Sequence, residues 1–183
     1  MPDHRLFISY KRGEDMTPVA TRLRDRVQVE LGGDVFPFMD RASIDVGDSW
    51  PATLDQELAQ ATLFAAFISV DYWTSEHCRK ELDVAIARRT AAANGRPRIL
   101  LILAEKLNLS RLTLSNKEAM DLLAAGAESR DGFGKIRALG DINFLGPYNP
   151  SGQLVRLHYE DRHALDDQLA SMTNKIASNL DSW

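Results

Sequence analysis

Short apolar stretches alternate with helical apolar stripes along the first hundred residues of the chain. Four stretches, at 5–10, 35–39, 64–69 and 98–103, are bounded by polar turns and have the length of strands. Those at 64–69 and 98–103 are almost wholly apolar, which is typical of strands buried on both faces of a parallel sheet. Because parallel neighbours need helical crossovers, the pattern predicts an α/β fold. We expect a flavodoxin-like three-layer sandwich, a central parallel sheet of about five strands flanked by helices.

The residues between the strands carry apolar side chains at every third or fourth position. The first predicted helix is capped by Thr17 and ends at Gly32. A second is capped by Asp48 or Ser49, and a third begins at Thr74. The inward positions of the three helices are Val19, Leu23, Val27 and Leu31; Leu54, Leu58 and Ala61; and Cys78, Leu82, Ala85 and Ile86.

The pattern weakens beyond residue 104. A short helix at 118–125 and a strand at 142–145 are predicted, and LVRLHY at 154–159 is a candidate edge strand. A last helix, from about 161 to 180, carries one apolar stripe formed by Leu165, Leu169, Met172 and Ile176. The order of elements shows no internal repeat and no linker.

Composition excludes several classes of function. With 183 residues, 44% hydrophobic and 26% charged, the chain has the size of one domain over 1–183. A net charge of −4 argues against a nucleic-acid binder. A single cysteine and no apolar run of membrane-spanning length lead us to expect a cytoplasmic protein without membrane contact. The histidines lack metal-ligand spacing, and no Gly-rich phosphate loop or nucleophile elbow appears, so no metal is expected.

The best candidate for chemistry is FISVDYWTSEHCRKEL at 67–82, where a strand turns into a helix. Ser75, Cys78 and Glu81 are spaced i, i+3 and i+6, so Cys78 and Glu81 are neighbours beside the apolar stripe. Glu81 should therefore be partly buried, beyond the carboxyl end of a strand, where open α/β sheets bind ligands. The alternative is a solvated glutamate on an ordinary surface helix.

Three stretches resemble, in order and spacing, the Toll/interleukin receptor (TIR) domain. FISYKRGED resembles its first box, FMDRASIDVGDSWPATLDQEL its second box with the BB loop, and SVDYWTSEHCRKEL the segment that holds the catalytic glutamate of enzymatic members. These boxes lie within 5–103, followed by a variable region at 104–160 and a C-terminal helix at 161–183. The resemblance implies the TIR fold.

The enzymatic, bacterial branch that the chain resembles cleaves NAD+ between nicotinamide and ribose. On that resemblance Glu81 is the catalytic residue, the products are nicotinamide and ADP-ribose or a cyclic isomer, and the setting is antiphage immunity or signalling. A single carboxylate suffices because nicotinamide leaves a cationic pyridinium as a neutral base and needs no general acid. One carboxylate can stabilise the oxocarbenium-like transition state.

Further substrate-binding candidates follow from the same resemblance, each with a structural alternative. The loop of Ser9, Tyr10, Lys11, Arg12 and Gly13 would form the cleft rim, where Lys11 or Arg12 could meet the pyrophosphate or be merely solvated. Asp40 could touch a ribose or only form a turn. Trp73 and Trp50 could stack on a base or fill core, and we favour core for Trp50.

The first turns of the predicted Glu81 helix contribute three more candidates. Ser75 could cap the helix, orient the surroundings of Glu81, or both. Cys78 is interpreted as a packing residue rather than a nucleophile. His77 stands where many enzymatic members have tryptophan, and we hypothesise that it hydrogen-bonds Glu81 one turn on.

The competing function is a non-catalytic interaction module. In that reading the BB loop, with Arg41, Ile44, Asp45, Val46 and Gly47, makes homotypic TIR–TIR contacts that build a signalling complex. The resemblance implies such self-association for the enzyme as well. A phospho-receiver is set aside because Ser69 stands where its acceptor aspartate would be. Hydrolysis or cyclisation, the oligomeric state and the activating trigger stay open.

Overall fold

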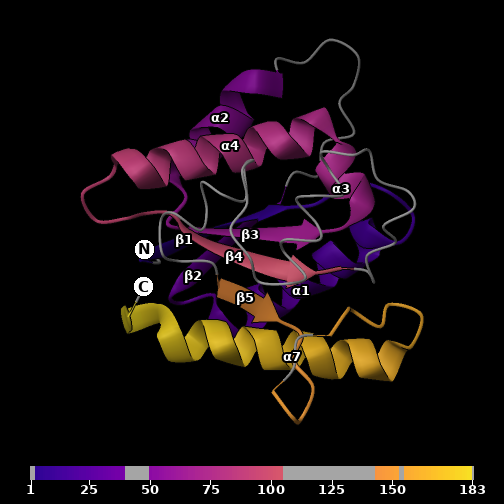
Figure 1. Ribbon diagram of the computed structural model, residues 1–183. Coiled ribbons are helices and arrows are strands. Elements are labelled where there is room, and N and C mark those ends of the chain that lie inside the picture. The colour runs from indigo at the N-terminus through magenta and orange to yellow at the C-terminus, as the bar shows by residue number, and fades with distance from the viewer. Residues whose placement is uncertain (1–2, 40–49, 105–142, 153–154, 183) are drawn as a thin grey trace.

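Five strands and flanking helices make up the computed structural model, which describes residues 3–39, 50–104, 143–152 and 155–182. Figure 1 shows a central sheet between two helical layers. The strands are β1 (His4–Ser9), β2 (Val35–Met39), β3 (Leu63–Ile68), β4 (Arg98–Leu103) and β5 (Asn143–Gly146). The helices are α1 (Met16–Leu31), α2 (Trp50–Gln60), α3 (Val70–Thr74), α4 (Glu76–Ala91), α7 (Arg162–Asn179) and the 3-10 turn η2 (Leu180–Ser182).

The described strands form one parallel sheet in the order β2-β1-β3-β4-β5. This is the flavodoxin-like order, and it confirms the predicted fold class. The chain begins in the middle of the sheet, moves to the β2 edge, then crosses back to β3 and continues outward to β5. The direction of the crossovers therefore reverses between β1 and β3, and a crevice is expected at the carboxyl ends of these two strands.

Alternation along each strand sorts the core into two layers. In β1, Leu6 and Ile8 pack toward α1 and α7, while Phe7 packs toward α2 and α4. Figure 1 shows α4 and α2 above the sheet and α7 below it. Both sides of β3 are fully buried, which confirms the expectation drawn from its apolar run. On β1, the same alternation places Ser9 on the Phe7 side of the sheet, under α4.

The C-terminal helix was predicted closely. Asp161 caps α7 by accepting hydrogen bonds from the backbone N–H groups of His163 and Ala164, at 3.0 and 3.2 Å. The four residues of the predicted stripe are buried. They cover the α1 side of the sheet next to β5, so the tail of the chain completes one helical layer.

The predicted start of the first helix was wrong. The first helix begins at Met16 with Asp15 at its cap position, and Thr17 lies inside its first turn. There the Thr17 hydroxyl accepts from Gly13 N–H at 3.3 Å, so it stabilises the loop before the helix.

The candidate edge strand at 154–159 is not a strand over its described residues, 155–159. Val155 N–H bonds Pro147 O and Leu157 N–H bonds Leu103 O, at 2.8 and 3.0 Å. The segment therefore passes the ends of β4 and β5 instead of pairing along one strand. The predicted helix at 118–125 lies outside the described residues.

Candidate active site

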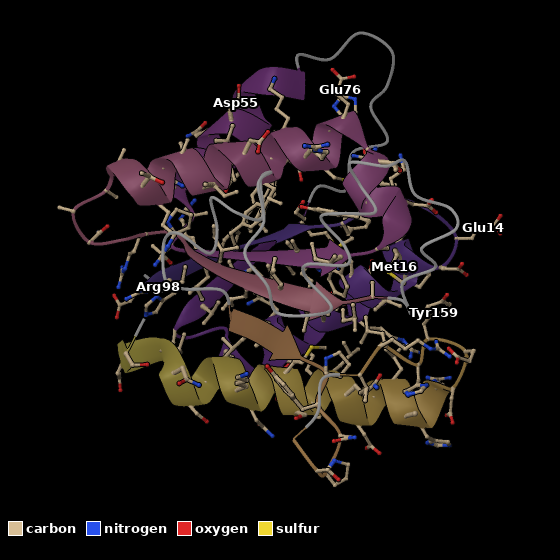
Figure 2. All side chains as sticks on the ribbon, in the orientation of Figure 1. Glu14, Met16, Asp55, Glu76, Arg98 and Tyr159 are labelled. Atoms are coloured by element: carbon tan, nitrogen blue, oxygen red, sulfur yellow. The ribbon has the colours of Figure 1, made fainter. Side chains whose placement is uncertain are left out.

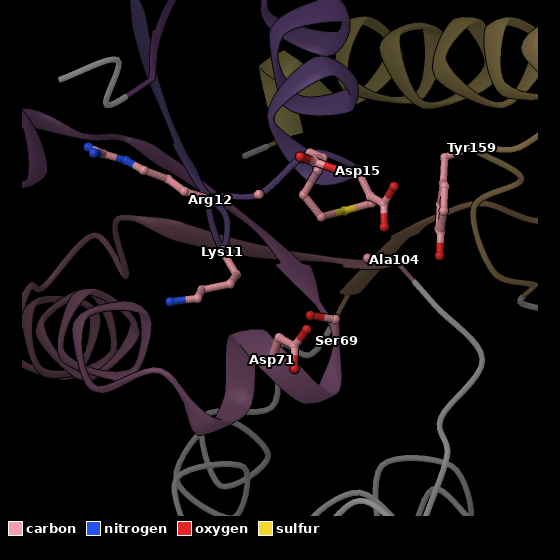
Figure 3. Close-up of a pocket in the computed structure, with 10 residues that line it drawn as sticks. Lys11, Arg12, Asp15, Ser69, Asp71, Ala104 and Tyr159 are labelled. Atoms are coloured by element: carbon pink, nitrogen blue, oxygen red, sulfur yellow. The ribbon is translucent and has the colours of Figure 1, made fainter. Parts of the chain in front are cut away.

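A pocket opens at the carboxyl ends of β1, β3 and β4, where the strand order reverses. Its volume is about 110 Å³, and its lining comes from the β1–α1 loop, the β3–α3 junction, the end of β4 and Tyr159. In Figure 3, Lys11 and Arg12 extend to the left, while Asp15 and Tyr159 stand on the right and Ser69 and Asp71 lie below. Pockets for drug-sized ligands are larger, roughly 300–1,000 Å³. This one is sized for one part of a larger ligand.

The side chains of the pocket gather at one end of the molecule. Figure 2 shows Glu14 and Tyr159 at that end, whereas Arg98, at the start of β4, lies at the opposite end. Lys11, Arg12 and Gly13 are exposed, in agreement with a rim position. Tyr10 differs, because its side chain is only 8% exposed and packs in the core on the α1 side.

The connection from β3 to α4 is built from two consecutive serine caps. Ser69 caps the one-turn helix α3 by accepting from Tyr72 N–H at 3.0 Å. Ser75 then caps α4 by accepting from Cys78 N–H at 3.5 Å, which confirms the capping role considered for it. Helix α3 was not predicted, and the prediction that the third helix begins at Thr74 was wrong: Thr74 ends α3, and α4 begins at Glu76 because Ser75 caps it.

Glu81 lies in the second turn of α4, partly buried as expected, and is tied to the end of β1. The hydroxyl of Ser9 lies 2.5 Å from Glu81 Oε2 and 2.9 Å from the hydroxyl of Tyr72. Ser9 is 1% exposed and Tyr72 is fully buried. The carboxylate is thus joined by buried hydroxyls to two other elements, β1 and α3. Ser9 meets Glu81 from below and offers almost no surface to a ligand.

Burial sets the ionisation of the groups around Glu81. The pKa of the Tyr72 phenol lies well above its usual 10.0, mainly because burial disfavours phenolate; the Ser9 hydrogen bond opposes this shift, and the negative charges of Cys78 and Glu81 add to it. Burial likewise raises the pKa of the Cys78 thiol, against the hydrogen bond from Ser75. Tyr72 therefore stays a neutral hydrogen-bond donor.

Cys78 is 4% exposed and packs in the core cluster between the sheet and α4. Nearby Glu81 adds to the rise in the pKa of its thiol, and the positive charge of Lys11 opposes it. A thiol with a raised pKa is a poor nucleophile at neutral pH, in agreement with its interpretation as a packing residue.

Several predicted site residues are not tested by the described coordinates. Asp40 and the BB-loop residues lie outside the described residues, as do the side chains of Trp50 and Trp73. His77 is exposed in the first turn of α4. Its proposed hydrogen bond to Glu81 stays a prediction.

Sequence reasoning missed Tyr72, Asp71 and Tyr159. The available signal for Tyr72 was a large aromatic residue three positions after Ser69, between the predicted strand and the predicted helix. Tyr159 had no local signal, because only the packing of the chain after β5 brings it to the pocket.

Within the described ranges, no group of three or more His, Cys, Asp or Glu side chains could hold a metal ion. No helix in the same part of the chain is long and apolar enough to cross a membrane.

A family model for the TIR domain matches residues 6–137. Among solved structures, the TIR domains of the activated Roq1 resistosome, which directly recognises the pathogen effector XopQ, superpose with a TM-score of 0.60 at 14% identity, over 94% of this chain and 99% of that one. A conserved protein from Enterococcus faecalis superposes with a TM-score of 0.51 at 12% identity, over 94% and 98%. At such identities the likeness concerns the fold. No curated protein sequence matches.

Proposed function

The chain belongs to the TIR domain family, and from this premise we propose that it is an NAD+ glycohydrolase or ADP-ribosyl cyclase of the enzymatic bacterial branch. Glu81 is the catalytic residue, NAD+ is the substrate, and no metal takes part. The observation that carries the proposal is the hydrogen bond from Ser9 to Glu81 Oε2, at 2.5 Å. It holds a partly buried carboxylate at the carboxyl ends of the strands, where α/β sheets bind ligands.

The chemistry needs one carboxylate and no acid. The bond between C1′ of the ribose and the pyridinium nitrogen breaks, and its electron pair neutralises the ring nitrogen. Positive charge develops on C1′ and the ring oxygen, where a fixed carboxylate stabilises it. Water then attacks C1′ and loses a proton to give ADP-ribose, or a nucleophilic atom of the same molecule attacks to give a cyclic isomer.

The remaining binding roles are those that the resemblance to the family implies. Lys11 and Arg12, exposed on the β1–α1 loop with Gly13, meet the pyrophosphate. Asp40 contacts a ribose. His77 and Trp73 supply the surface for nicotinamide. Ser9, Ser75 and Cys78 shape the site on the α4 side of the sheet, whereas Tyr10 supports the loop from the core on the α1 side.

The activity depends on homotypic TIR–TIR contacts in which the BB loop of one copy completes the cleft of the next. The structural likeness to the TIR domains of the Roq1 resistosome, an assembly by name, supports this arrangement. The protein acts in the cytoplasm, in antiphage immunity or signalling. Specific activity should rise with protein concentration, and a constant value over a wide range would contradict the dependence on assembly.

The deciding experiment is NAD+ consumption with separation of products, for the wild-type chain and Glu81→Gln, at several concentrations and with a crowding agent. We expect nicotinamide release by the wild type and its loss in the variant; ADP-ribose or a cyclic isomer then identifies the reaction. Glu76→Gln, on the exposed first turn of the same helix, is the matched control. If neither the wild type nor either variant consumes NAD+ under assembling conditions, the second candidate is favoured, a non-catalytic TIR–TIR interaction module. The likeness to a TIR assembly also supports that candidate.

A further inference from the structure

The hydrogen bonds of Ser9 have one direction when Glu81 is ionised. A hydroxyl has one proton to donate, and a carboxylate can only accept. The Ser9 proton therefore points to Glu81 Oε2, 2.5 Å away. Ser9 Oγ must then accept at its other short contact, 2.9 Å from the Tyr72 hydroxyl, so Tyr72 donates. The result is a directed chain from Tyr72 through Ser9 to Glu81.

Burial keeps that direction unchanged over the working pH range. Tyr72 and Ser9 are both inaccessible to solvent, at 0% and 1% exposed. Phenolate is disfavoured in this environment, because burial raises the pKa of Tyr72 well above its usual range. The phenol cannot lose its proton near neutral pH, and water is not at hand to replace it as the donor to Ser9.

The backbone of Tyr72 is fixed between the two serine caps. Its N–H donates to Ser69 Oγ at 3.0 Å, and its carbonyl accepts from Ser75 N–H at 3.1 Å. Ser75 in turn starts the helix that carries Glu81. One residue thus contacts the end of β3, the start of α4 and, through its hydroxyl, the end of β1.

We propose that Tyr72 is a positioning residue for the carboxylate: its hydroxyl donates to Ser9 Oγ, which anchors Ser9 and strengthens the hydrogen bond by which Ser9 holds Glu81 Oε2 under the reacting ribose. This inference rests on the proposed NAD+ cleavage by Glu81 and assigns that site a support which Tyr72 provides without touching substrate. Removing the Tyr72 hydroxyl leaves the buried Ser9 Oγ without this donor, so Ser9 is held less firmly and its hydrogen bond to Glu81 is weaker.

The test uses Tyr72→Phe, Ser9→Ala and the double variant in the full chain. Tyr72→Phe removes one oxygen and keeps the ring that fills the core. We expect kcat for NAD+ to fall about threefold to tenfold at unchanged KM, the effect of one net hydrogen bond. The acid limb of the kcat–pH profile should move to higher pH, because a lost donor disfavours the ionised carboxylate.

A second readout does not depend on turnover. Carbon-13 NMR follows the titration of the Glu81 carboxyl group, assigned by its absence in Glu81→Gln. The titration midpoint should rise in Tyr72→Phe and in Ser9→Ala. Because Tyr72 acts through Ser9, adding Tyr72→Phe to Ser9→Ala should change little further. Tyr148→Phe, a half-exposed tyrosine against Lys175 on α7, is the control and should leave the Glu81 titration unchanged.

The outcomes separate this inference from the proposed function. Suppose that NAD+ cleavage depends on Glu81, but that Tyr72→Phe changes neither kcat nor the titration of Glu81. The positioning role of Tyr72 would then be overturned, while the proposed NAD+ cleavage would stand. Additive effects in the double variant would likewise overturn it, since a merely structural loss would add. If the wild type is inactive but the titration of Glu81 still responds to Tyr72→Phe through Ser9, the proposed NAD+ cleavage would be overturned. The hydrogen-bond connection from Tyr72 through Ser9 to Glu81 would stand.

Discussion

The two ends of the sheet bury polar side chains in different ways. At the carboxyl ends, Ser9, Tyr72 and Glu81 bond to one another through side-chain atoms. At the amino ends, the half-buried Arg88 and the buried Arg89 bond to main-chain carbonyls: Arg88 Nη1 donates to Leu58 O and Ala61 O, and Arg89 Nη1 donates to Gly95 O and Pro97 O.

The difference lies in what each set of bonds satisfies. The arginines supply donors to carbonyls at the end of α2 and in the turn before β4, groups that helices and turns leave without backbone partners. They therefore stabilise the fold. The hydrogen bonds that link Tyr72, Ser9 and Glu81 at the other end run between side chains and orient a carboxylate. Removing a residue should thus cost stability at the amino ends and rate at the carboxyl ends, and the following experiments test that separation.

The largest effect is expected for Glu81→Gln. Loss of one fixed group that stabilises transition-state charge commonly costs about 100- to 1,000-fold in kcat. The fold should persist, because glutamine keeps the shape and can still accept from Ser9. NAD+ turnover and thermal unfolding, measured together, check this. An unfolded variant would show that Glu81 is needed for the fold, and a fully active one would show that it is not catalytic. Either result would contradict the expected separation between the two ends of the sheet.

Arg89→Met should show the opposite behaviour. Arg89 is 6% exposed, and the substitution leaves the Gly95 and Pro97 carbonyls without a charged donor. Hydrogen bonds to charged groups contribute about 1.5–3 kcal/mol, and we expect a loss of that order in the free energy of unfolding, read from urea titration. Activity per folded molecule should not change. Arg26→Met, whose i,i+4 ion pair to Glu30 is on the surface of α1, is the control and should cost far less.

A smaller effect is expected at the pocket rim. Lys11→Met should raise KM for NAD+ about threefold to tenfold with little change in kcat, because an exposed lysine contributes mainly to binding of the pyrophosphate. The effect should shrink as salt is added. Lys80→Met, an exposed lysine on α4, is the comparison variant. An equal rise in KM for both would mean that net charge, and not the position of Lys11, matters.

The smallest effect concerns Cys78. Burial raises the pKa of its thiol, so the thiolate is depleted between pH 7 and 9 and the native protein should be alkylated more slowly than the urea-unfolded chain throughout that range. Cys78→Ala should keep kcat within about twofold. Rapid alkylation at pH 7 accompanied by loss of activity would instead indicate that the Cys78 thiol takes part in the activity.

Much of the fold could be predicted from local pattern. The apolar runs of β3 and β4, the stripe of α7 and the strand-helix alternation are properties of neighbouring residues, and they led to the observed parallel sheet. Element ends were less predictable, because the start of α1 depends on how the Gly13 loop closes and the path of 155–159 depends on where β4 and β5 end.

The candidate site divides in the same manner. The sequence by itself determined that Glu81 stands early in a helix that follows a buried strand, and that Ser75 and Cys78 are near it, because helical spacing is local. Only the tertiary structure decided that Ser9, 72 residues away, donates to Glu81, and that Tyr72 stands behind Ser9. Those contacts exist because β1 pairs with β3 in the middle of the sheet, with Ser9 beside Ala66, and strand order is set by long-range packing that no single stretch of sequence encodes.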